Sequence, residues 1–155
     1  MKFASFTALA AVFGSAAAAN KANVINECTS AIYVQSFPFD GSAPGPLTTV
    51  KPGQRFSEDI RTAGSTIKIA TTKTLDKPLF FGYSTQSKPN NVYYEFSTEW
   101  GNPFADKHNI LSPGEGCEKF DCKAGDAKCY STPSMKKVYG CPSPVNLYAK
   151  VCSKN

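Results

Sequence analysis

Apolar and polar residues alternate in short runs along most of the chain, which is typical of β-strands with one buried face. In the clearest run, residues 92–97, Val92, Tyr94 and Phe96 alternate with more polar positions. Similar short runs predict strands over residues 23–26, 31–35, 54–60, 66–71, 79–83 and 145–151. Turn residues such as those at 51–53 and 88–91 separate them, and no amphipathic helix pattern of useful length occurs. The pattern therefore predicts an all-β fold, an antiparallel β-sandwich.

The stretch from residue 106 to residue 139 breaks this pattern. It shows little alternation and contains Cys117, Cys122 and Cys129. We predict a C-terminal loop region that disulfides hold in place.

The first residues have the composition of a secretory signal. Lys2 precedes an apolar run from Phe3 to Val12, and the segment ends in four alanines at 16–19. These features predict a signal peptide over residues 1–19 and one domain over residues 20–155. No second apolar stretch approaches the length that a membrane helix needs. The protein is expected to be secreted, and to be extracellular or associated with the cell wall.

The chain has six cysteines, and all of them follow the predicted signal. An even number in an exported protein indicates disulfides, although six cysteines allow fifteen pairings. No Cys-x-x-Cys pair occurs, and His108 is the only histidine. We therefore predict neither a metal site nor a cofactor.

Residues 92–104 combine aromatic rings with carboxylates and supply the candidate ligand-binding residues. Tyr93, Trp100 and Phe104 can present ring faces to a sugar, and Glu95 and Asn102 can supply hydrogen bonds. The alternative is that the same rings pack in the core and the acids face solvent.

Catalytic residues are not predicted. A glycosidase needs two carboxyl groups about 5 to 5.5 Å or about 6.5 to 9.5 Å apart. Glu99 follows Glu95 by four residues, so in an extended strand the two would stand roughly 13 Å apart. There is also no Gly-x-Ser-x-Gly motif for a nucleophilic serine.

The formal net charge of +5 adds a second kind of candidate surface. A basic patch of this kind can hold a protein to an anionic wall or host surface, although lysines also cover ordinary soluble proteins. Nucleic acid is not an expected partner, because the protein is exported and has only two arginines. The lysines concerned are Lys119, Lys123, Lys128, Lys136 and Lys137.

Several spaced motifs resemble the thaumatin-like proteins, especially the small fungal secreted members of the yeast-phase-specific and conidial-germination types. The motifs are Asn26-x-Cys28 followed by Ile32-Tyr33-Val34, Pro52-Gly53-Gln54, Tyr94-Glu95-Phe96-Ser97 with Gly101-Asn102, Cys117-x4-Cys122-x6-Cys129, and Cys141-Pro142 followed by Cys152.

The resemblance implies a thaumatin-like β-sandwich that lacks the second domain of the larger members. It implies that Cys28 pairs with Cys152 and that Cys117 pairs with Cys141. The family partners of the other two cysteines fall in a segment missing here, which leaves Cys122 with Cys129.

The resemblance also bears on function. Larger members have an acidic cleft, and Glu95 matches its first acid. Trp100, however, stands where the second acid is expected, and Lys136 and Lys137 stand near another. We therefore expect a monomeric, non-enzymatic protein that binds wall polysaccharide such as β-glucan during germination or morphogenesis. The alternatives are an effector or adhesin acting on a host or competitor, and a weak β-1,3-glucanase.

Overall fold

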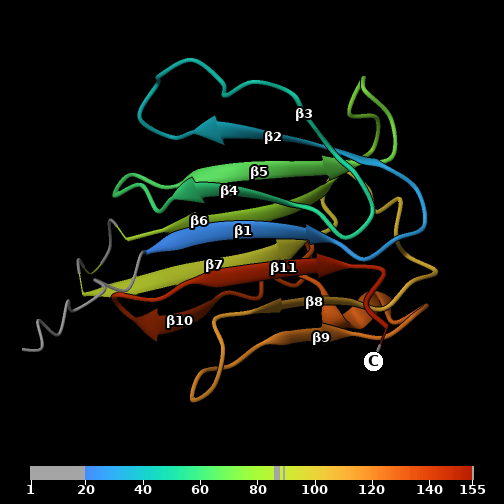
Figure 1. Ribbon diagram of the computed structural model, residues 1–155. Helices are drawn as coiled ribbons and strands as arrows, with labels where there is room; N and C mark the ends of the chain where they lie inside the picture. Colours follow the sequence, from blue (N-terminus) through green and yellow to red (C-terminus); the bar gives the residue numbers. More distant parts are fainter. Residues whose placement is uncertain (1–19, 86–87, 89, 155) are drawn as a thin grey trace, which may run out of the picture.

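The computed structural model describes residues 20–154 except residues 86, 87 and 89. These residues form two β-sheets that lie one over the other, with the strands aligned along nearly the same axis (Figure 1). The predicted all-β sandwich is therefore confirmed. The signal peptide predicted over residues 1–19 lies outside the described residues, so it and the domain boundary after it stay predictions.

The first sheet, sheet A, contains five strands within the described residues, in the order β4-β1-β11-β8-β9. Strands β1 and β11 run parallel at its centre, and the other neighbours are antiparallel. The two strands nearest the ends of the described chain are thus hydrogen-bonded to each other. The strands of sheet A are β1 (Lys21–Asn26), β4 (Arg55–Asp59), β8 (Asn109–Ser112), β9 (Phe120–Cys122) and β11 (Leu147–Val151).

The second sheet, sheet B, contains six strands in the same part of the chain, in the order β10-β7-β6-β5-β2-β3, and all its pairs are antiparallel. Its strands are β2 (Ile32–Pro38), β3 (Thr48–Val50), β5 (Ser65–Ala70), β6 (Leu79–Ser84), β7 (Asn91–Ser97) and β10 (Tyr139–Pro142).

The hydrophobic core lies between the two sheets. Phe96 of β7 meets Phe120 of β9 edge to face, with ring centroids 6.3 Å apart, so the inner faces touch. Each large apolar side chain buried here contributes about 1.5 to 3 kcal/mol. The other large side chains of this core include Val24, Ile32, Ile67, Ile69, Leu79, Phe81, Tyr94, Leu111 and Leu147.

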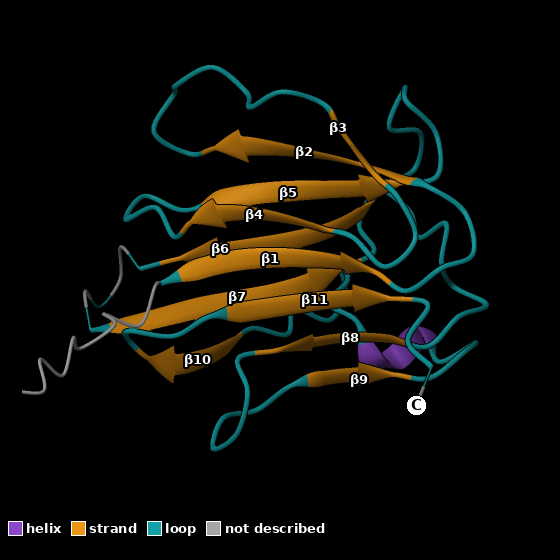
Figure 2. Cartoon of the chain, in the orientation of Figure 1, coloured by secondary structure: helices purple, strands orange, loops and turns teal. Residues whose placement is uncertain are grey.

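The disulfides pair as the resemblance implies. Cys28–Cys152 joins the ends of β1 and β11, Cys117–Cys141 ties the segment before β9 to β10, and Cys122–Cys129 joins β9 to a short 3-10 helix, η1 (Ala127–Cys129). Figure 2 shows η1 beside the C-terminal end of the chain. No described cysteine is free.

The prediction of an irregular region over residues 106–139 was partly wrong. Strands β8 and β9 lie within it, and β10 begins at its last residue. These strands have only three or four residues, which is too short to reveal a period of two, and they form because β11 and β7 offer backbone partners.

Among the described residues, no helix is long and apolar enough to span a membrane.

Candidate functional site

Strand β7 divides its side chains between two faces. Tyr94 and Phe96 are buried in the core, whereas Tyr93 and Glu95 lie partly exposed on the outer face of sheet B. This is the alternation that an extended strand imposes. The outer face of sheet B is therefore the surface on which Tyr93 and Glu95 can meet a ligand.

Two glycines on neighbouring strands make room for these side chains. Gly82 of β6 stands opposite Glu95, and Gly140 of β10 stands opposite Tyr93. A Cβ atom at Gly140 would lie 3.0 Å from Tyr93 Cε1, and a Cβ atom at Gly82 would lie 3.2 Å from Glu95 Cγ. Both side chains therefore lie across a glycine, and with Phe39 they line an open hollow.

A second hollow on the same face gathers four aromatic rings. Phe37, Phe39, Phe80 and Trp100 line it together with Lys68. The rings of Phe80 and Trp100 stack with centroids 6.4 Å apart and planes 30° apart. Trp100 is 63% exposed and Phe39 is 56% exposed, so this hollow offers ring surface to solvent.

Phe39 lines both hollows, which makes them neighbours on one surface. We call this surface the aromatic face. Its residues are Phe37, Phe39, Lys68, Phe80, Tyr93, Glu95 and Trp100.

Lys68 stands in the middle of the aromatic hollow. It pairs with Phe80 across the β5–β6 ladder, and its Nζ lies 4.2 Å from the centroid of Phe37 and 5.6 Å from that of Phe80. Attraction between the ammonium group and the ring faces holds the lysine over the sheet.

The turn after β7 fixes the position of Trp100. The Gly101 N–H donates to the carbonyl oxygen of Thr98 at 3.1 Å, which closes the turn. Gly101 has a φ of +141°, and a Cβ atom there would lie 2.4 Å from the carbonyl oxygen of Lys77. The turn thus packs on the backbone of the loop before β6, which places the Trp100 ring beside Phe80.

The other two predicted ligand-binding residues, Asn102 and Phe104, make contacts within the protein. The Asn102 Oδ1 accepts a hydrogen bond from the Phe104 N–H at 2.9 Å, inside their own turn. This turn carries Phe104 into the core, where it is 2% exposed. The prediction that Phe104 presents its ring to a ligand was therefore wrong, because the chain folds back after Trp100.

Sequence reasoning missed Phe37, Phe39, Lys68 and Phe80. Phe37 and Phe80 occupy outward positions of their strands, and an aromatic ring at such a position is a signal in its own right. The missing information was the strand order, because only the neighbours β2, β5 and β6 bring Phe37, Lys68 and Phe80 into one row.

Four of the five lysines predicted to form a basic patch have partners within the protein. Lys119 and Lys123 both bind Asp121, at 3.2 and 3.3 Å. Their charge is therefore partly neutralised at short range, which weakens the case for an anion-binding patch here. The other two bind elsewhere: Lys136 to Glu99 at 3.2 Å, and Lys137 to the carbonyl oxygens of Lys128 and Cys129.

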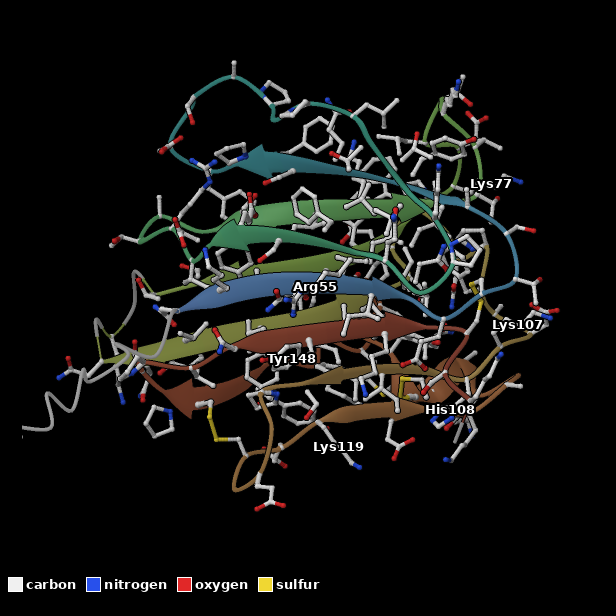
Figure 3. The ribbon with its side chains drawn as sticks, in the orientation of Figure 1. Arg55, Lys77, Lys107, His108, Lys119 and Tyr148 are labelled. Carbon is white, nitrogen blue, oxygen red and sulfur yellow. A yellow bond between two sulfur atoms is a disulfide. The ribbon has the colours of Figure 1, made fainter. Side chains whose placement is uncertain are left out.

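Asp121 is the centre of this charge cluster on the outer side of sheet A, where Figure 3 labels His108 and Lys119. His108 Nε2 lies 2.6 Å from Asp121 Oδ1. The hydrogen bond from His108, helped by the two lysines, lowers the pKa of Asp121 to about 2. His108 Nδ1 is buried and has no partner among the described residues, which suits the tautomer with its proton on Nε2.

The aromatic face has little of the chemistry that catalysis requires. Among the described residues, Glu95 is the only acid that lines its hollow, and Asp76 is the only acid that lines the neighbouring one. Glu99, which lies in the turn after β7, forms an ion pair with Lys136. Within the described chain, no group of three or more His, Cys, Asp or Glu side chains is placed to hold a metal ion.

Comparison with protein families places this geometry in a known group. The model of the family described as Blastomyces yeast-phase-specific protein, Bys1, matches residues 9–153. The chain belongs to this family. The resemblance to the yeast-phase-specific type is therefore confirmed, whereas the conidial-germination type has no support of its own.

Two solved structures are similar to this member of the Bys1 family. The protein elicitor MoHrip2 from Magnaporthe oryzae is 60% identical, with a TM-score of 0.84, and the match covers 87% of this chain and 100% of that chain. The thaumatin-like xylanase inhibitor TLXI is 14% identical, with a TM-score of 0.61, and the match covers 85% of this chain and 99% of that chain. The second likeness shows the fold alone, which is thaumatin-like. The search of curated proteins found no match.

Proposed function

We propose that this chain is a secreted, non-enzymatic protein that binds cell-wall polysaccharide, β-glucan included, through the aromatic face. The observation that carries the proposal is the exposed ring of Trp100, held beside Phe80 on the outer surface of sheet B. The proposal retains three of the residues predicted from sequence, namely Tyr93, Glu95 and Trp100.

The chemistry of the aromatic face suits a sugar polymer. Pyranose rings have apolar C–H faces that pack on aromatic rings, and polar groups at the margin fix their orientation. Here Glu95 can accept hydrogen bonds from hydroxyl groups, and Lys68 can donate them. An open hollow along several strands also suits an extended chain better than a small enclosed ligand.

The exposed rings need an explanation that folding does not supply. Phe39 and Trp100 are both more than half exposed, although burial would stabilise them. Clustered apolar side chains on a protein surface usually mark a site of interaction.

The absence of a second acid beside Glu95 supports the non-enzymatic part of the proposal. Acid–base hydrolysis of a glycosidic bond needs two carboxyl groups flanking that bond. The described lining of the Glu95 hollow supplies one. We therefore assign Glu95 a binding role rather than a catalytic one.

Membership of the yeast-phase-specific family supports a link between the proposed function and a change of growth form. A change of growth form remodels the wall, so a protein of this family that binds wall polymer would act during morphogenesis. We extend the same role to germination, when the wall is also rebuilt.

A pull-down with insoluble polysaccharide tests the proposal. Wild-type protein should be retained on β-1,3-glucan or another wall polymer, and Trp100→Ala should lower retention at least tenfold. Tyr148→Ala is the matched control, because Tyr148 is a partly exposed aromatic residue on the outer face of sheet A (Figure 3). Equal retention of the wild type and Trp100→Ala, or no retention on any wall polymer, would contradict the proposal.

An elicitor-like action on a host is the second candidate function. It is supported by the 60% identity to a protein elicitor across all of that chain. Purified protein applied to plant tissue should then trigger a defence response such as an oxidative burst. If Trp100→Ala triggers the same response as the wild type, elicitation does not use the aromatic face.

A further inference from the structure

The ammonium group of Lys68 is the most unusual charge on the aromatic face. It lies between the rings of Phe37 and Phe80, at 4.2 and 5.6 Å from their centroids. Among the described residues it makes no ion pair and no hydrogen bond. Lys136, in contrast, binds Glu99 in the turn after β7. The rings beside the ammonium group remove part of its hydration. No carboxylate among the described residues compensates for this loss.

The other charges of the hollow leave it positive. Lys77 lines the same hollow, as does one acid, Asp76. The carboxylate of Asp76 already accepts hydrogen bonds from the hydroxyl groups of Thr72 and Thr74 in its own loop. Two lysines and one acid thus line the hollow.

The two hollows of the aromatic face therefore differ in charge. Lys68 and Lys77 lie with Trp100, whereas Glu95 lies in the neighbouring hollow. A polymer that follows the face meets a positive subsite with exposed rings and then a negative one. A neutral sugar would gain from the rings and from hydrogen bonds, whereas a sugar with a carboxylate would gain in addition from the charge of Lys68.

We propose that the hollow lined by Phe37, Lys68, Phe80 and Trp100 is a subsite for an acidic sugar, a uronic acid residue within a polysaccharide. The pyranose ring stacks on Trp100 and its carboxylate pairs with Lys68. This inference rests on the proposed polysaccharide-binding function and adds a chemical class of ligand to it. The attraction is strengthened because the rings exclude water from one side of the ammonium group.

Calorimetric titration with two oligosaccharide probes tests the subsite. One probe is oligogalacturonate, which carries a carboxylate on each sugar, and the other is a neutral β-1,3-glucan oligosaccharide of similar length. Wild-type protein should bind the uronate at least tenfold more tightly, and 0.5 M NaCl should reduce that preference. Lys68→Gln should abolish the preference, because the glutamine amide can still donate a hydrogen bond to a sugar hydroxyl group but has no charge to pair with the carboxylate.

Three further variants complete the test. Lys68→Arg keeps the charge over the rings and should retain the preference. Lys150→Gln removes a lysine from the outer face of sheet A and should change nothing. Trp100→Ala should weaken binding of both probes.

The outcomes separate the subsite from the function on which it rests. Equal affinity for the two probes, or a uronate preference that survives Lys68→Gln, overturns the acidic subsite and leaves polysaccharide binding standing. If wild-type protein binds neither these probes nor any wall polymer, the proposed function itself fails.

Discussion

Asp121 is the residue whose surroundings make the clearest prediction about pH. His108, Lys119 and Lys123 all bind its carboxylate, and its pKa falls to about 2 from an ordinary value of 3.8. A carboxyl group whose pKa is lower in the folded state stabilises the fold above its unfolded pKa. That stability is lost as the pH falls from about 4 towards 2.

Asp121→Asn should therefore lower the free energy of unfolding by about 1 kcal/mol at pH 7, since the group is partly exposed and solvent screens the charges. Denaturant unfolding between pH 7 and pH 2 would show the difference from wild type shrinking below pH 4. Asp106→Asn is the control, because Asp106 is exposed and pairs only with its neighbour Lys107. A difference that persists unchanged at pH 2 would show that charge at Asp121 is not the cause.

Because Gly101 has no side chain, the turn that contains Trp100 can pack closely against the backbone of Lys77. Gly101→Ala should lower the free energy of unfolding by about 1 to 3 kcal/mol, because the backbone conformation is strained for alanine. It should also displace Trp100, since the new Cβ would lie 2.4 Å from the Lys77 carbonyl oxygen.

Thermal unfolding and tryptophan emission would measure the two effects of Gly101→Ala. Gly114→Ala is the control, because Gly114 also has a positive φ, +100°, but has nothing within 4 Å of the added Cβ. This control should lose stability without changing Trp100 emission. Identical emission from Gly101→Ala and wild type would contradict the role given to this turn.

At the scale of elements, β1 and β11, the first and last strands described, pair in parallel at the centre of sheet A. The Cys28–Cys152 disulfide fixes this pair and joins residues 124 apart, whereas Cys122–Cys129 joins residues 7 apart. In the chain-entropy model the long link contributes roughly 5 kcal/mol and the short one roughly 2.5 kcal/mol.

The double variant Cys28→Ala/Cys152→Ala should therefore be the less stable of the two double variants. Urea denaturation of it and of Cys122→Ala/Cys129→Ala would give the two free energies of unfolding. If removing Cys122–Cys129 lowers the free energy of unfolding more than removing Cys28–Cys152, loop length does not decide how much each disulfide stabilises the fold.

The elements also show what could be predicted from sequence. Strands β1, β2, β4 to β7 and β11 could be predicted because each has five or more residues. Burial alternates regularly in β2, β7 and β11, whereas β1 and β6 bury three consecutive residues. Strands β3, β8, β9 and β10 have three or four residues and depend on partners far along the chain. Tyr93, Glu95 and Trp100 could be found from one segment, but the row Phe37, Lys68, Phe80 required the order of strands in the folded sheet.

At the scale of the whole molecule, the two outer surfaces of the sandwich have different chemistry. The outer face of sheet B exposes aromatic rings beside Lys68, which has no ion pair within the part of the chain that the structure describes. The outer face of sheet A carries polar side chains such as Arg55 and Tyr148 (Figure 3). The face proposed to bind a ligand is thus separate from the outer face of sheet A, and the variants on sheet A serve as controls for those on sheet B.

Trp100 offers the most direct test of the central claim, because it is the only tryptophan in the chain and lies on the aromatic face. Its emission can be followed while oligosaccharides of the retained polymer are added to wild-type protein, with binding measured in parallel by calorimetry. We predict a saturable shift of the emission to shorter wavelength, with the midpoint that calorimetry gives, as the sugar covers the ring. Binding without any change in Trp100 emission would contradict the account.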